Sequence, residues 1–369
     1  MSQRPRTVVC VVGARPNYMK AAPIVAALKD SARFRPLLVH TGQHYDPDMN
    51  DTFFAELGMP APDANLEVGS GSHAVQTAQV MIRFEPVLDA AHDPIVLVVG
   101  DVNSTIACAL VAAKKGVPVV HVEAGLRSRD RAMPEEINRV LTDQISDLLF
   151  TTERSAAANL TAEGITPERV HFVGNVMIDT LVANLPRATA PAETLAAAGL
   201  AVPESFALST LHRPSNVDEP EVLARLLDCL AEIGRELPVV MPLHPRTRGR
   251  IEAAGLAHKL DGRTILPLGP QGYLAMLGLM KHARLVLTDS GGIQEETTAL
   301  GIPCLTLRDN TERPATVEFG TNTVVGRDTG RILAATREIL DNGGKAGRVP
   351  EFWDGKAALR IKAVLDSVF

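Results

Sequence analysis

Three carboxylate side chains lie at points where the sequence changes from apolar to polar. Asp101 and Glu123 each end an apolar run, and Glu135 lies in a Met-Pro-Glu-Glu segment shortly afterwards. Carboxylates that share a site suit general acid and base catalysis, because different surroundings can push their pKa values apart. For one carboxylate alone, a helix cap or a salt bridge is the alternative interpretation. Their grouping after apolar runs favours proton transfer.

The turn formed by Ser290, Gly291 and Gly292 has the features of an anion site. It follows an apolar run and precedes a helix-like segment, so backbone amides at a helix N-terminus can meet a phosphate that the glycines allow to approach. A tight turn without a ligand is the alternative, because the spacing matches neither common phosphate-binding motif. Glu296 could accept both hydroxyls of a ribose, and Arg313 adds a cation. Together these residues indicate a nucleoside diphosphate.

Further polar side chains follow other apolar runs in both halves of the sequence. They are Arg15, Lys20, Gln43, His44, His212, Arg213 and His244. In open parallel sheets ligands bind beyond the carboxyl ends of the strands, so these residues are candidates for one ligand site. The spacing of His, Cys and Asp residues matches no metal site, and we expect no metal. The sequence also lacks the nucleophile elbow of serine hydrolases.

The elements that must position these residues are short apolar runs that alternate with Ala- and Leu-rich, helix-like segments. This alternation is typical of βαβ units, and continuously apolar runs are typical of strands covered on both faces. Two series of runs occur: 7–14, 35–42, 94–101, 117–124, 148–152 and 170–175, then 205–213, 238–245, 264–269, 285–291, 302–307 and 321–326. The sequence therefore predicts an α/β protein with two Rossmann-like, doubly wound parallel sheets.

A chain of 369 residues exceeds the size that one hydrophobic core serves, so we expect two domains. The Ala- and Pro-rich stretch 183–204 separates the two series of runs and predicts a linker or poorly ordered crossover. We expect an N-terminal domain at 1–180 with the carboxylates, and a C-terminal domain at 181–352 that binds the nucleotide. An amphipathic helix at 353–369 carries an apolar stripe of Ala358, Ile361, Val364, Leu365 and Val368.

Composition excludes several classes of protein. The net charge of −6 and the aromatic content of 4% provide neither the basic surface nor the stacking side chains of nucleic-acid binders. No apolar stretch reaches about 18 residues, so we expect no membrane span, and no secretion signal is recognisable. The four cysteines are scattered inside apolar runs, which predicts buried free thiols and a cytoplasmic protein.

With these residues assembled, the sequence resembles the non-hydrolysing UDP-N-acetylglucosamine 2-epimerases over nearly its whole length. The resemblance rests on segments that occur in order: GARPNYMKAAPI, TGQHYD, VVGDVNST, HVEAGLRS, MPEEINR, GNVMIDTL, HRPSN, LTDSGGIQEE, RDNTERPATVEFGT and DGKAALRI. It implies two Rossmann-like domains in the glycosyltransferase B arrangement, with the active site in a cleft between them. It also implies a C-terminal helix that packs back on the N-terminal domain, and a homodimer.

The resemblance further implies a reaction and a set of site residues. The reaction inverts C2 of UDP-N-acetylglucosamine by anti elimination of UDP to 2-acetamidoglucal and re-addition of UDP, without a cofactor. Asp101, Glu123, Glu135 and His212 take the catalytic positions, and which base serves which face of the sugar stays open. The residues implied to bind UDP and the sugar are Arg15, Lys20, Gln43, His44, Arg139, Arg213, His244, Ser290, Gly291, Gly292, Glu296 and Arg313.

Four alternatives stay open beside this reaction. Arg129 and Arg131 could face the carboxylate of a modified UDP-sugar such as a diacetamido uronic acid, or they could be solvated loop charges. A hydrolysing epimerase would differ only in its product. A glycosyltransferase, or a UDP-sugar sensor without catalysis, would leave the three carboxylates unexplained. The residues around Gln43 and His44 differ from the pattern of relatives that a second substrate molecule activates.

Overall fold

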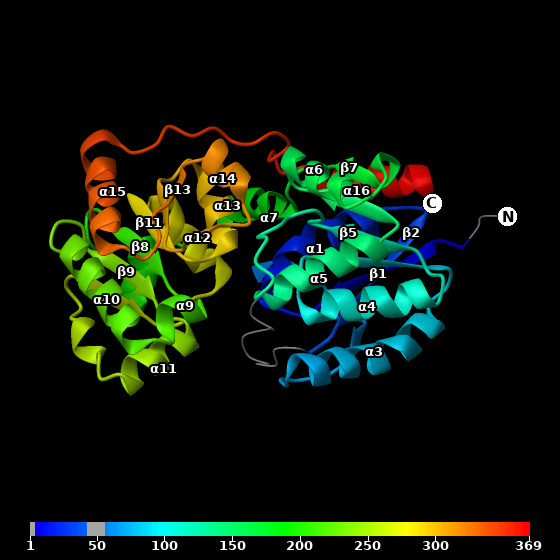
Figure 1. The fold of residues 1–369 in the computed structure, drawn as a ribbon, viewed down its shortest axis with the longest axis horizontal. Coiled ribbons are helices and arrows are strands. Elements are labelled where there is room, and N and C mark those ends of the chain that lie inside the picture. Colours follow the sequence, from blue (N-terminus) through cyan, green and yellow to red (C-terminus); the bar gives the residue numbers. More distant parts are fainter. Residues whose placement is uncertain (1–3, 43–55) are drawn as a thin grey trace. The chain divides into compact units, whose positions relative to one another are not determined.

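The computed structural model of the protein describes residues 4–42 and 56–369, and within them the chain divides into two compact units (Figure 1). Unit 1 comprises Met1–Ala183 and Glu351–Phe369, and unit 2 comprises Asn184–Pro350. Among the described helices, none is both long and apolar enough to cross a membrane.

Unit 1 contains a parallel sheet in the order β3-β2-β1-β4-β5-β6-β7. Its strands are β1 (Arg6–Val12), β2 (Phe34–His40), β3 (Ala64–Asn65), β4 (Pro94–Val99), β5 (Val119–Val122), β6 (Leu148–Thr151) and β7 (Val170–Phe172). The order reverses between β1 and β4, which is where a doubly wound sheet opens a crevice at its carboxyl edge.

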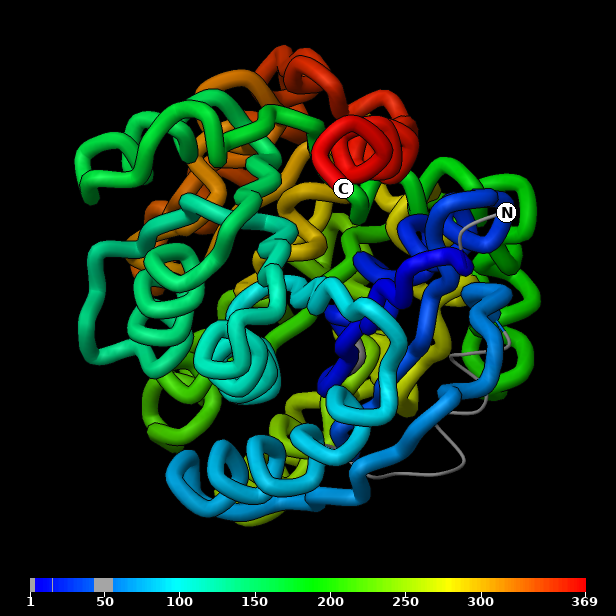
Figure 2. The backbone as a smooth tube through the Cα atoms, turned by 90° about the vertical axis from the view of Figure 1, so that its right-hand side faces the viewer, coloured from blue at the N-terminus to red at the C-terminus, as the bar shows by residue number. Residues whose placement is uncertain are grey.

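Helices cover both faces of this sheet, as right-handed crossovers in opposite directions require. They are α1 (Arg15–Lys29), α3 (His73–Ala90), α4 (Asn103–Lys114), α5 (Pro134–Ile145), α6 (Arg154–Ala162), α7 (Val176–Asn184) and α16 (Ala357–Val368), with a 3-10 turn at Pro167–Arg169. Helices α3, α4 and α5 pack side by side, whereas α16 packs on α1, as Figure 2 shows with α16 in red beside the blue α1.

The return of the chain to unit 1 is fixed by specific contacts. Asp179 on α7 accepts hydrogen bonds from the backbone amides of Ala357 and Ala358 at 3.0 and 2.8 Å, and so caps α16. The indole of Trp353 donates to the carbonyl of Thr152 at 3.0 Å. Of the expected apolar stripe, Ala358, Ile361 and Leu365 are buried, whereas Val368 is 50% exposed and does not belong to the packed face.

Unit 2 contains a second parallel sheet, in the order β10-β9-β8-β11-β12-β13. Its strands are β8 (Ala207–Thr210), β9 (Val239–Pro242), β10 (Ile265–Leu268), β11 (Leu285–Thr288), β12 (Cys304–Thr306) and β13 (Asn322–Val324). Its helices are α8 (Pro191–Ala197), α9 (Pro214–Val217), α10 (Pro220–Gly234), α11 (Pro245–Ala253), α12 (Tyr273–His282), α13 (Gly291–Leu300), α14 (Pro314–Glu318) and α15 (Thr329–Asn342), with 3-10 turns at Leu185–Arg187 and Ala257–Lys259.

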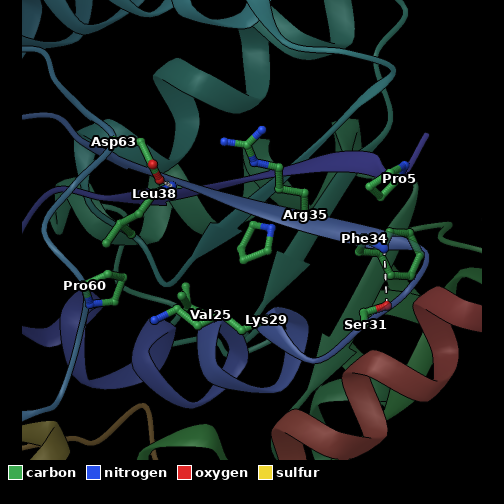
Figure 3. A pocket seen from close by; sticks show the side chains of 10 residues that line it. Pro5, Val25, Lys29, Ser31, Phe34, Arg35, Leu38, Pro60 and Asp63 are labelled. Atoms are coloured by element: carbon green, nitrogen blue, oxygen red, sulfur yellow. Dashed lines mark hydrogen bonds between the residues drawn. The ribbon is translucent and has the colours of Figure 1, made fainter.

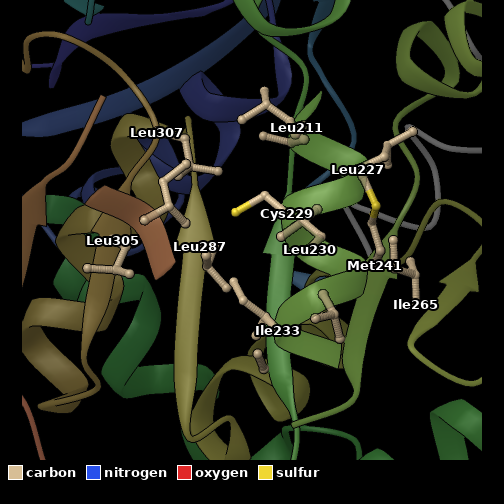
Figure 4. Packing of buried hydrophobic residues seen from close by; sticks show 14 of the residues in the cluster. Leu211, Leu227, Cys229, Leu230, Ile233, Met241, Ile265, Leu287, Leu305 and Leu307 are labelled. Carbon is tan, nitrogen blue, oxygen red and sulfur yellow. The ribbon is translucent and has the colours of Figure 1, made fainter. Parts of the chain in front are cut away.

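The core of unit 2 lies between its sheet and the helices α10 and α15. Leu227, Leu230 and Ile233 on α10 reach the strands, where they meet Met241 and Leu287 (Figure 4). Helix α10 is amphipathic, and its buried side chains recur at the three- and four-residue spacing of one helix face.

The fold predicted from the sequence is confirmed: all twelve predicted runs contain strands and both sheets are parallel. The two-residue strand β3 was not predicted. The expectation of a linker at 183–204 is wrong, because this stretch holds α8 and packs on α12. The carbonyl of Thr189 would lie 1.7 Å from a Cβ at Gly278, so the absence of a side chain there allows this approach. The four cysteines are buried free thiols, as predicted.

Candidate functional site

The end of β1 and the end of β4 are joined by one side chain, Asn17. Its Oδ1 accepts hydrogen bonds from the backbone amides of Gly13 and Ala14 at 3.2 and 3.0 Å, and its Nδ2 donates to the carbonyl of Val99 at 2.9 Å. Asn17 therefore fixes the start of α1 against the end of β4. Lys20 lies further along α1, and Asp101 follows β4.

Lys20 and Glu123 form a buried ion pair beside Gly100. A Cβ at Gly100 would lie 3.2 Å from Glu123 Oε2 and 3.4 Å from Lys20 Nζ, and Gly100 has a φ of +69°. Glycine at this position therefore lets the ion pair approach the residue that precedes Asp101. Glu123 itself has a φ of +72°, which is rare for a residue with a side chain.

Asp101 is held by α5. Arg139 Nη2 and Nε lie 2.6 and 3.0 Å from Asp101 Oδ2, and Asn138 Nδ2 donates to the Asp101 carbonyl at 2.9 Å. Glu135 lies on the same face of α5 as Arg139, four residues earlier, and is half-buried. The structure therefore brings Lys20, Asp101, Glu123 and Arg139 to one edge of the sheet, with Glu135 on the helix that borders it.

Glu136, which the sequence did not single out, fixes this arrangement. Its carboxylate accepts hydrogen bonds from the amides of Ser128 and Arg129 at 2.9 and 2.8 Å and from Arg139 Nη1 at 2.7 Å. Burial raises the pKa of Glu136, but these hydrogen bonds outweigh burial and hold the pKa below its usual value. Glu136 is therefore a carboxylate that orients Arg139 toward Asp101.

Four other candidate residues lie in the first half of the chain. Arg15 is the first residue of α1, in the turn that Asn17 fixes. Gln43 and His44 lie outside the described residues. Arg129 donates to Asn159 Oδ1 at 2.9 Å, so this arginine is bound to α6.

In unit 2, His212 and Asp289 form a dyad. His212 Nδ1 lies 2.8 Å from Asp289 Oδ1, and the carboxylate also accepts from the backbone amide of Arg213 at 2.9 Å and from Asn216 Nδ2 at 3.0 Å. Burial raises the pKa of Asp289, but the hydrogen bond and charge of His212 and the backbone donors lower it overall. The dyad fixes a proton on His212 Nδ1 and so makes Nε2 of the neutral ring a hydrogen-bond acceptor, which is the arrangement of a general acid or base.

His244 lies beside His212, at a ring-centroid distance of 5.8 Å. It is the N-cap of α11, and its Nδ1 accepts from the amide of Arg246 at 3.2 Å. Because Nδ1 accepts, the proton of the neutral ring is on Nε2. His244 therefore offers a hydrogen-bond donor where His212 offers an acceptor.

The glycine turn after β11 opens helix α13. The Ser290 amide donates a hydrogen bond to Thr288 Oγ1 at 3.0 Å, and the side chain of Ser290, the N-cap residue, does not cap the helix. The amides that follow lack intrahelical acceptors, as at any helix start. A Cβ at Gly291 would lie 2.9 Å from Glu312 Oε1 and 3.7 Å from Arg313 Nε, so glycine at this position lets these two side chains approach the turn closely.

Arginines gather around this turn. Arg308 Nη2 lies 2.8 Å from Glu312, Arg213 Nη2 lies 3.9 Å from Glu312, and Arg313 Nε lies 3.0 Å from Glu295. Burial raises the pKa of Glu312, but Arg313 and Arg308 hold it well below its usual range. Arg213 Nε and Arg308 Nη1 are buried without a hydrogen-bond partner in the part of the chain that the structure describes. An anion at the turn would supply acceptors for such donors.

Glu296 lies one turn along α13 and is buried. Its Oε1 accepts a hydrogen bond from the Tyr273 hydroxyl at 2.9 Å. Burial raises the pKa of Glu296 to about 8, and the charge of Glu295 adds to this effect, whereas the Tyr273 hydrogen bond opposes it. A ligand that donates further hydrogen bonds would favour the ionised form.

Two negative observations delimit the site. Residues 4–42 and 56–369 contain no cluster of three or more His, Cys, Asp or Glu side chains that could hold a metal ion. A cavity of about 420 Å³ in unit 1 opens between α1 and β2, where Val25, Lys29, Phe34 and Arg35 contribute to its lining (Figure 3). None of the candidate residues lines this cavity.

Two doubly wound parallel sheets, one bordered by paired carboxylates and the other by a cationic glycine turn, define an α/β protein of the glycosyltransferase B type. The chain belongs to the UDP-N-acetylglucosamine 2-epimerase family, whose model matches residues 26–366. This membership makes the protein an isomerase.

Several relatives resemble the chain over most of its length. A UDP-N-acetylglucosamine 2-epimerase of Methanococcus maripaludis is 42% identical, over 89% of this chain and 90% of that protein. A UDP-2,3-diacetamido-2,3-dideoxy-D-glucuronate 2-epimerase of Pseudomonas aeruginosa is 44% identical, over 90% and 92%. The crystal structure of the Methanocaldococcus jannaschii UDP-GlcNAc 2-epimerase in complex with UDP-GlcNAc and UDP superimposes with a TM-score of 0.89, at 41% identity, over 98% of this chain and 99% of that one.

Proposed function

We propose that this protein inverts C2 of UDP-N-acetylglucosamine to give UDP-N-acetylmannosamine. The observation that carries the proposal is that two carboxylates, each paired with a cation, lie at adjacent strand ends: Glu123 beside Gly100, and Asp101 directly after it. A binding protein or a glycosyltransferase has no need of two such carboxylates. The relatives named for this reaction and the crystal structure that holds UDP-GlcNAc and UDP support the same conclusion.

The proposed mechanism follows from the chemistry of C2. No carbonyl acidifies the C2 proton, so direct removal of the proton is not feasible. Instead a base takes this proton while the bond from C1 to the UDP oxygen breaks, which gives 2-acetamidoglucal and UDP. An acid then returns a proton to C2 from the opposite face, and the UDP oxygen adds again to C1. The proposed acids and bases are Asp101, Glu123, Glu135 and His212.

The departing UDP needs stabilisation of its negative charge, which we assign to unit 2. In this proposal the diphosphate binds the amides of Gly291 and Gly292 together with Arg213 and Arg313, and Glu296 accepts hydrogen bonds from the ribose. The other proposed contacts to UDP and the sugar are Arg15, Lys20, Gln43, His44, Arg139, His244 and Ser290.

Proton NMR in heavy water tests the proposal. The protein is incubated with UDP-N-acetylglucosamine, and the anomeric and C2 signals are followed. We expect UDP-N-acetylmannosamine with deuterium at C2. Free N-acetylmannosamine with UDP would identify a hydrolysing enzyme instead. Turnover confined to UDP-2,3-diacetamido-2,3-dideoxy-D-glucuronate in a parallel incubation would overturn the proposed substrate.

We further propose a cytoplasmic homodimer. The cysteines are free thiols, which suits a reducing compartment. Exposed apolar side chains on helices α3 and α5, which both pack against α4, support association of two copies: Val75, Ile82, Ile137 and Leu141. Sedimentation equilibrium tests this proposal, and a mass of one chain at micromolar concentration would overturn it.

A further inference from the structure

His121 is a buried histidine on β5 that no step of the proposed reaction uses. Its side chain has no solvent exposure, and both ring nitrogens have partners. Nδ1 lies 2.6 Å from Asp143 Oδ1 on α5, and Nε2 lies 2.8 Å from the carbonyl oxygen of Gly100. The ring therefore connects helix α5 to the end of β4.

Both partners of His121 are acceptors. The carbonyl of Gly100 can only accept a hydrogen bond. The carboxylate of Asp143 also accepts from the amide of Gly125 at 3.1 Å and from Arg127 Nη2 at 2.7 Å. Burial raises the pKa of Asp143, but His121 and Arg127 outweigh burial and hold the pKa below its usual value. The ion pair with Arg127 by itself favours the ionised carboxylate. Two acceptors require a proton on each ring nitrogen.

We propose that His121 is a buried imidazolium, held by Asp143, that acts as a positioning residue for Asp101 and Glu123. This inference rests on the proposed function, in which those two carboxylates exchange protons with the sugar.

The geometry shows what the pair positions. His121 fixes the Gly100 carbonyl, directly before Asp101, while Asp143 fixes the Gly125 amide, two residues after Glu123. Gly100 and Glu123 both have positive φ angles, so each turn adopts a conformation that is unfavourable for most residues and needs support from its surroundings. One ion pair thus supports both strand ends that carry the carboxylates.

The charged groups around the His121 ring form pairs of opposite sign. Behind Asp143, Arg127 forms two hydrogen bonds with Glu163, at 2.8 and 2.6 Å. Positive and negative groups thus alternate in one row, in the order His121, Asp143, Arg127 and Glu163. On the side of the proposed reaction, Lys20 pairs with Glu123 and Arg139 pairs with Asp101. A neutral His121 would leave one positive charge fewer in this row and one of its two acceptors without a donor.

Two conservative variants separate the two hydrogen bonds. The amide nitrogen of Gln takes the place of Nε2, so H121Q keeps the donor to Gly100, whereas the amide nitrogen of Asn takes the place of Nδ1, so H121N keeps only the donor to Asp143. We expect kcat to fall by about 10²-fold in H121N, with partial rescue in H121Q, because small displacements of reacting groups have effects of this size. KM and UDP affinity stay within about twofold, since UDP is bound elsewhere.

The matched control is H171N. His171 lies on β7, two strands away from β5 in the same sheet, with its ring 5.9 Å from that of Phe150, so this variant makes the same change farther from the carboxylates. We expect its kcat to stay within about twofold of the native value, a change too small to reflect misplaced reacting groups. Equal values of kcat in H121N and H171N, at equal melting temperatures, would overturn the positioning role.

Nitrogen NMR of histidine-labelled protein tests the imidazolium without any substrate. We expect two protonated ring nitrogens for His121 at pH 8, and an unprotonated nitrogen there would overturn the assignment. If the native protein fails to epimerise, the proposed function fails, but the spectrum still decides the charge. The amide signals of Asp101 and Gly125 then decide the positioning, because they shift in H121N and not in H171N if the inference holds.

Discussion

The two units present opposite charge arrangements at the same edge of the same kind of sheet. In unit 1 the cations are matched by carboxylates, because Lys20 pairs with Glu123 and Arg139 pairs with both Asp101 and Glu136. In unit 2 two arginines, Arg213 and Arg308, share the carboxylate of Glu312, and each has a buried donor without a hydrogen-bond partner among the described residues. Under the proposed function, one topology serves proton transfer in unit 1 and anion binding in unit 2, depending on which side chains follow its strands.

The correspondence extends to single positions. In both sheets the strand order reverses beside the first strand of the unit, at β1 and β4 and at β8 and β11. Asp101 follows β4, and Asp289 and Ser290 follow β11. Asp101 is bound by an arginine from a helix, whereas Asp289 is bound by backbone amides and an imidazole. We assign the Asp101 carboxylate to proton transfer, whereas the hydrogen bonds of Asp289 fix the backbone at His212 and Arg213.

Among the variants that distinguish the roles of the two units, D101N is expected to have the largest effect on turnover. An amide of the same shape cannot accept a proton, so turnover should fall by at least about 10³-fold. UDP affinity should be unchanged, as measured by calorimetry, because we assign UDP to unit 2. Asp89→Asn, on the exposed surface of α3, is the control. Turnover within tenfold of the native value would remove Asp101 from the mechanism.

D289N tests the dyad of unit 2. Without the carboxylate, His212 loses the partner that fixes its proton, and kcat should fall by about 10²-fold. Because the two residues act as a unit, the variant H212N with D289N should be no slower than the slower single variant. Melting curves measured in parallel separate this effect from unfolding. Multiplicative losses in the double variant would show that the two groups act independently.

Replacement of Glu296 should affect binding and not chemistry. E296A is expected to weaken UDP binding by about 1–3 kcal/mol, the usual loss for hydrogen bonds to a charged group. Calorimetry measures this difference. Glu193→Ala, on the exposed side of α8, should leave the affinity unchanged. An unchanged affinity in E296A would exclude the ribose contact.

The pH dependence of UDP binding is a second test of the role of Glu296 in unit 2. The pKa of Glu296 is raised to about 8 by burial, so near neutral pH the group is mostly protonated in the free protein. If UDP binds the ionised form, affinity should rise by about fivefold between pH 7 and 8, as the ionised fraction grows. UDP titrates as well, so the matched comparison is E296Q, in which this part of the rise should vanish. A rise of the same size in both proteins would contradict the assignment.

The last prediction concerns the stability of unit 1 and not its activity. D179A removes the acceptor for the amides of Ala357 and Ala358, and the free energy of unfolding should fall by about 1–2 kcal/mol, the usual cost of a lost helix cap. Urea unfolding measures this change. Asp366→Ala, on the same helix, is the control and should have a smaller effect because its partner Lys362 is near the surface. Equal losses would mean that Asp179 does not act as a cap.

Much of the fold could be predicted because continuously apolar runs identify buried parallel strands. The strand β3 has two residues and carries no such pattern, and α8 lies in an Ala- and Pro-rich stretch whose composition indicates a linker. Its helical structure depends on packing against α12, and a contact between distant segments leaves no periodic signal in either.

The candidate residues could be found because they follow strands, but their partners could not. Glu136 orients Arg139 and Asp143 binds His121, yet nothing in their local sequence distinguishes them from solvent-exposed helix carboxylates. Asn17 is a similar case, since its role depends on the carbonyl of Val99, more than eighty residues away. Sequence patterns locate the strand ends, whereas the hydrogen bonds that fix them require the fold.

The insertion of unit 2 between the two segments of unit 1 has a consequence for biosynthesis. The ribosome completes Asn184–Pro350 before it makes Glu351–Phe369, so unit 2 can fold while unit 1 still lacks α16. Until translation reaches that helix, the surface of α1 that it covers stays open to chaperones and proteases. A premature stop near codon 350 would therefore yield a chain with a whole second unit and an unfinished first one.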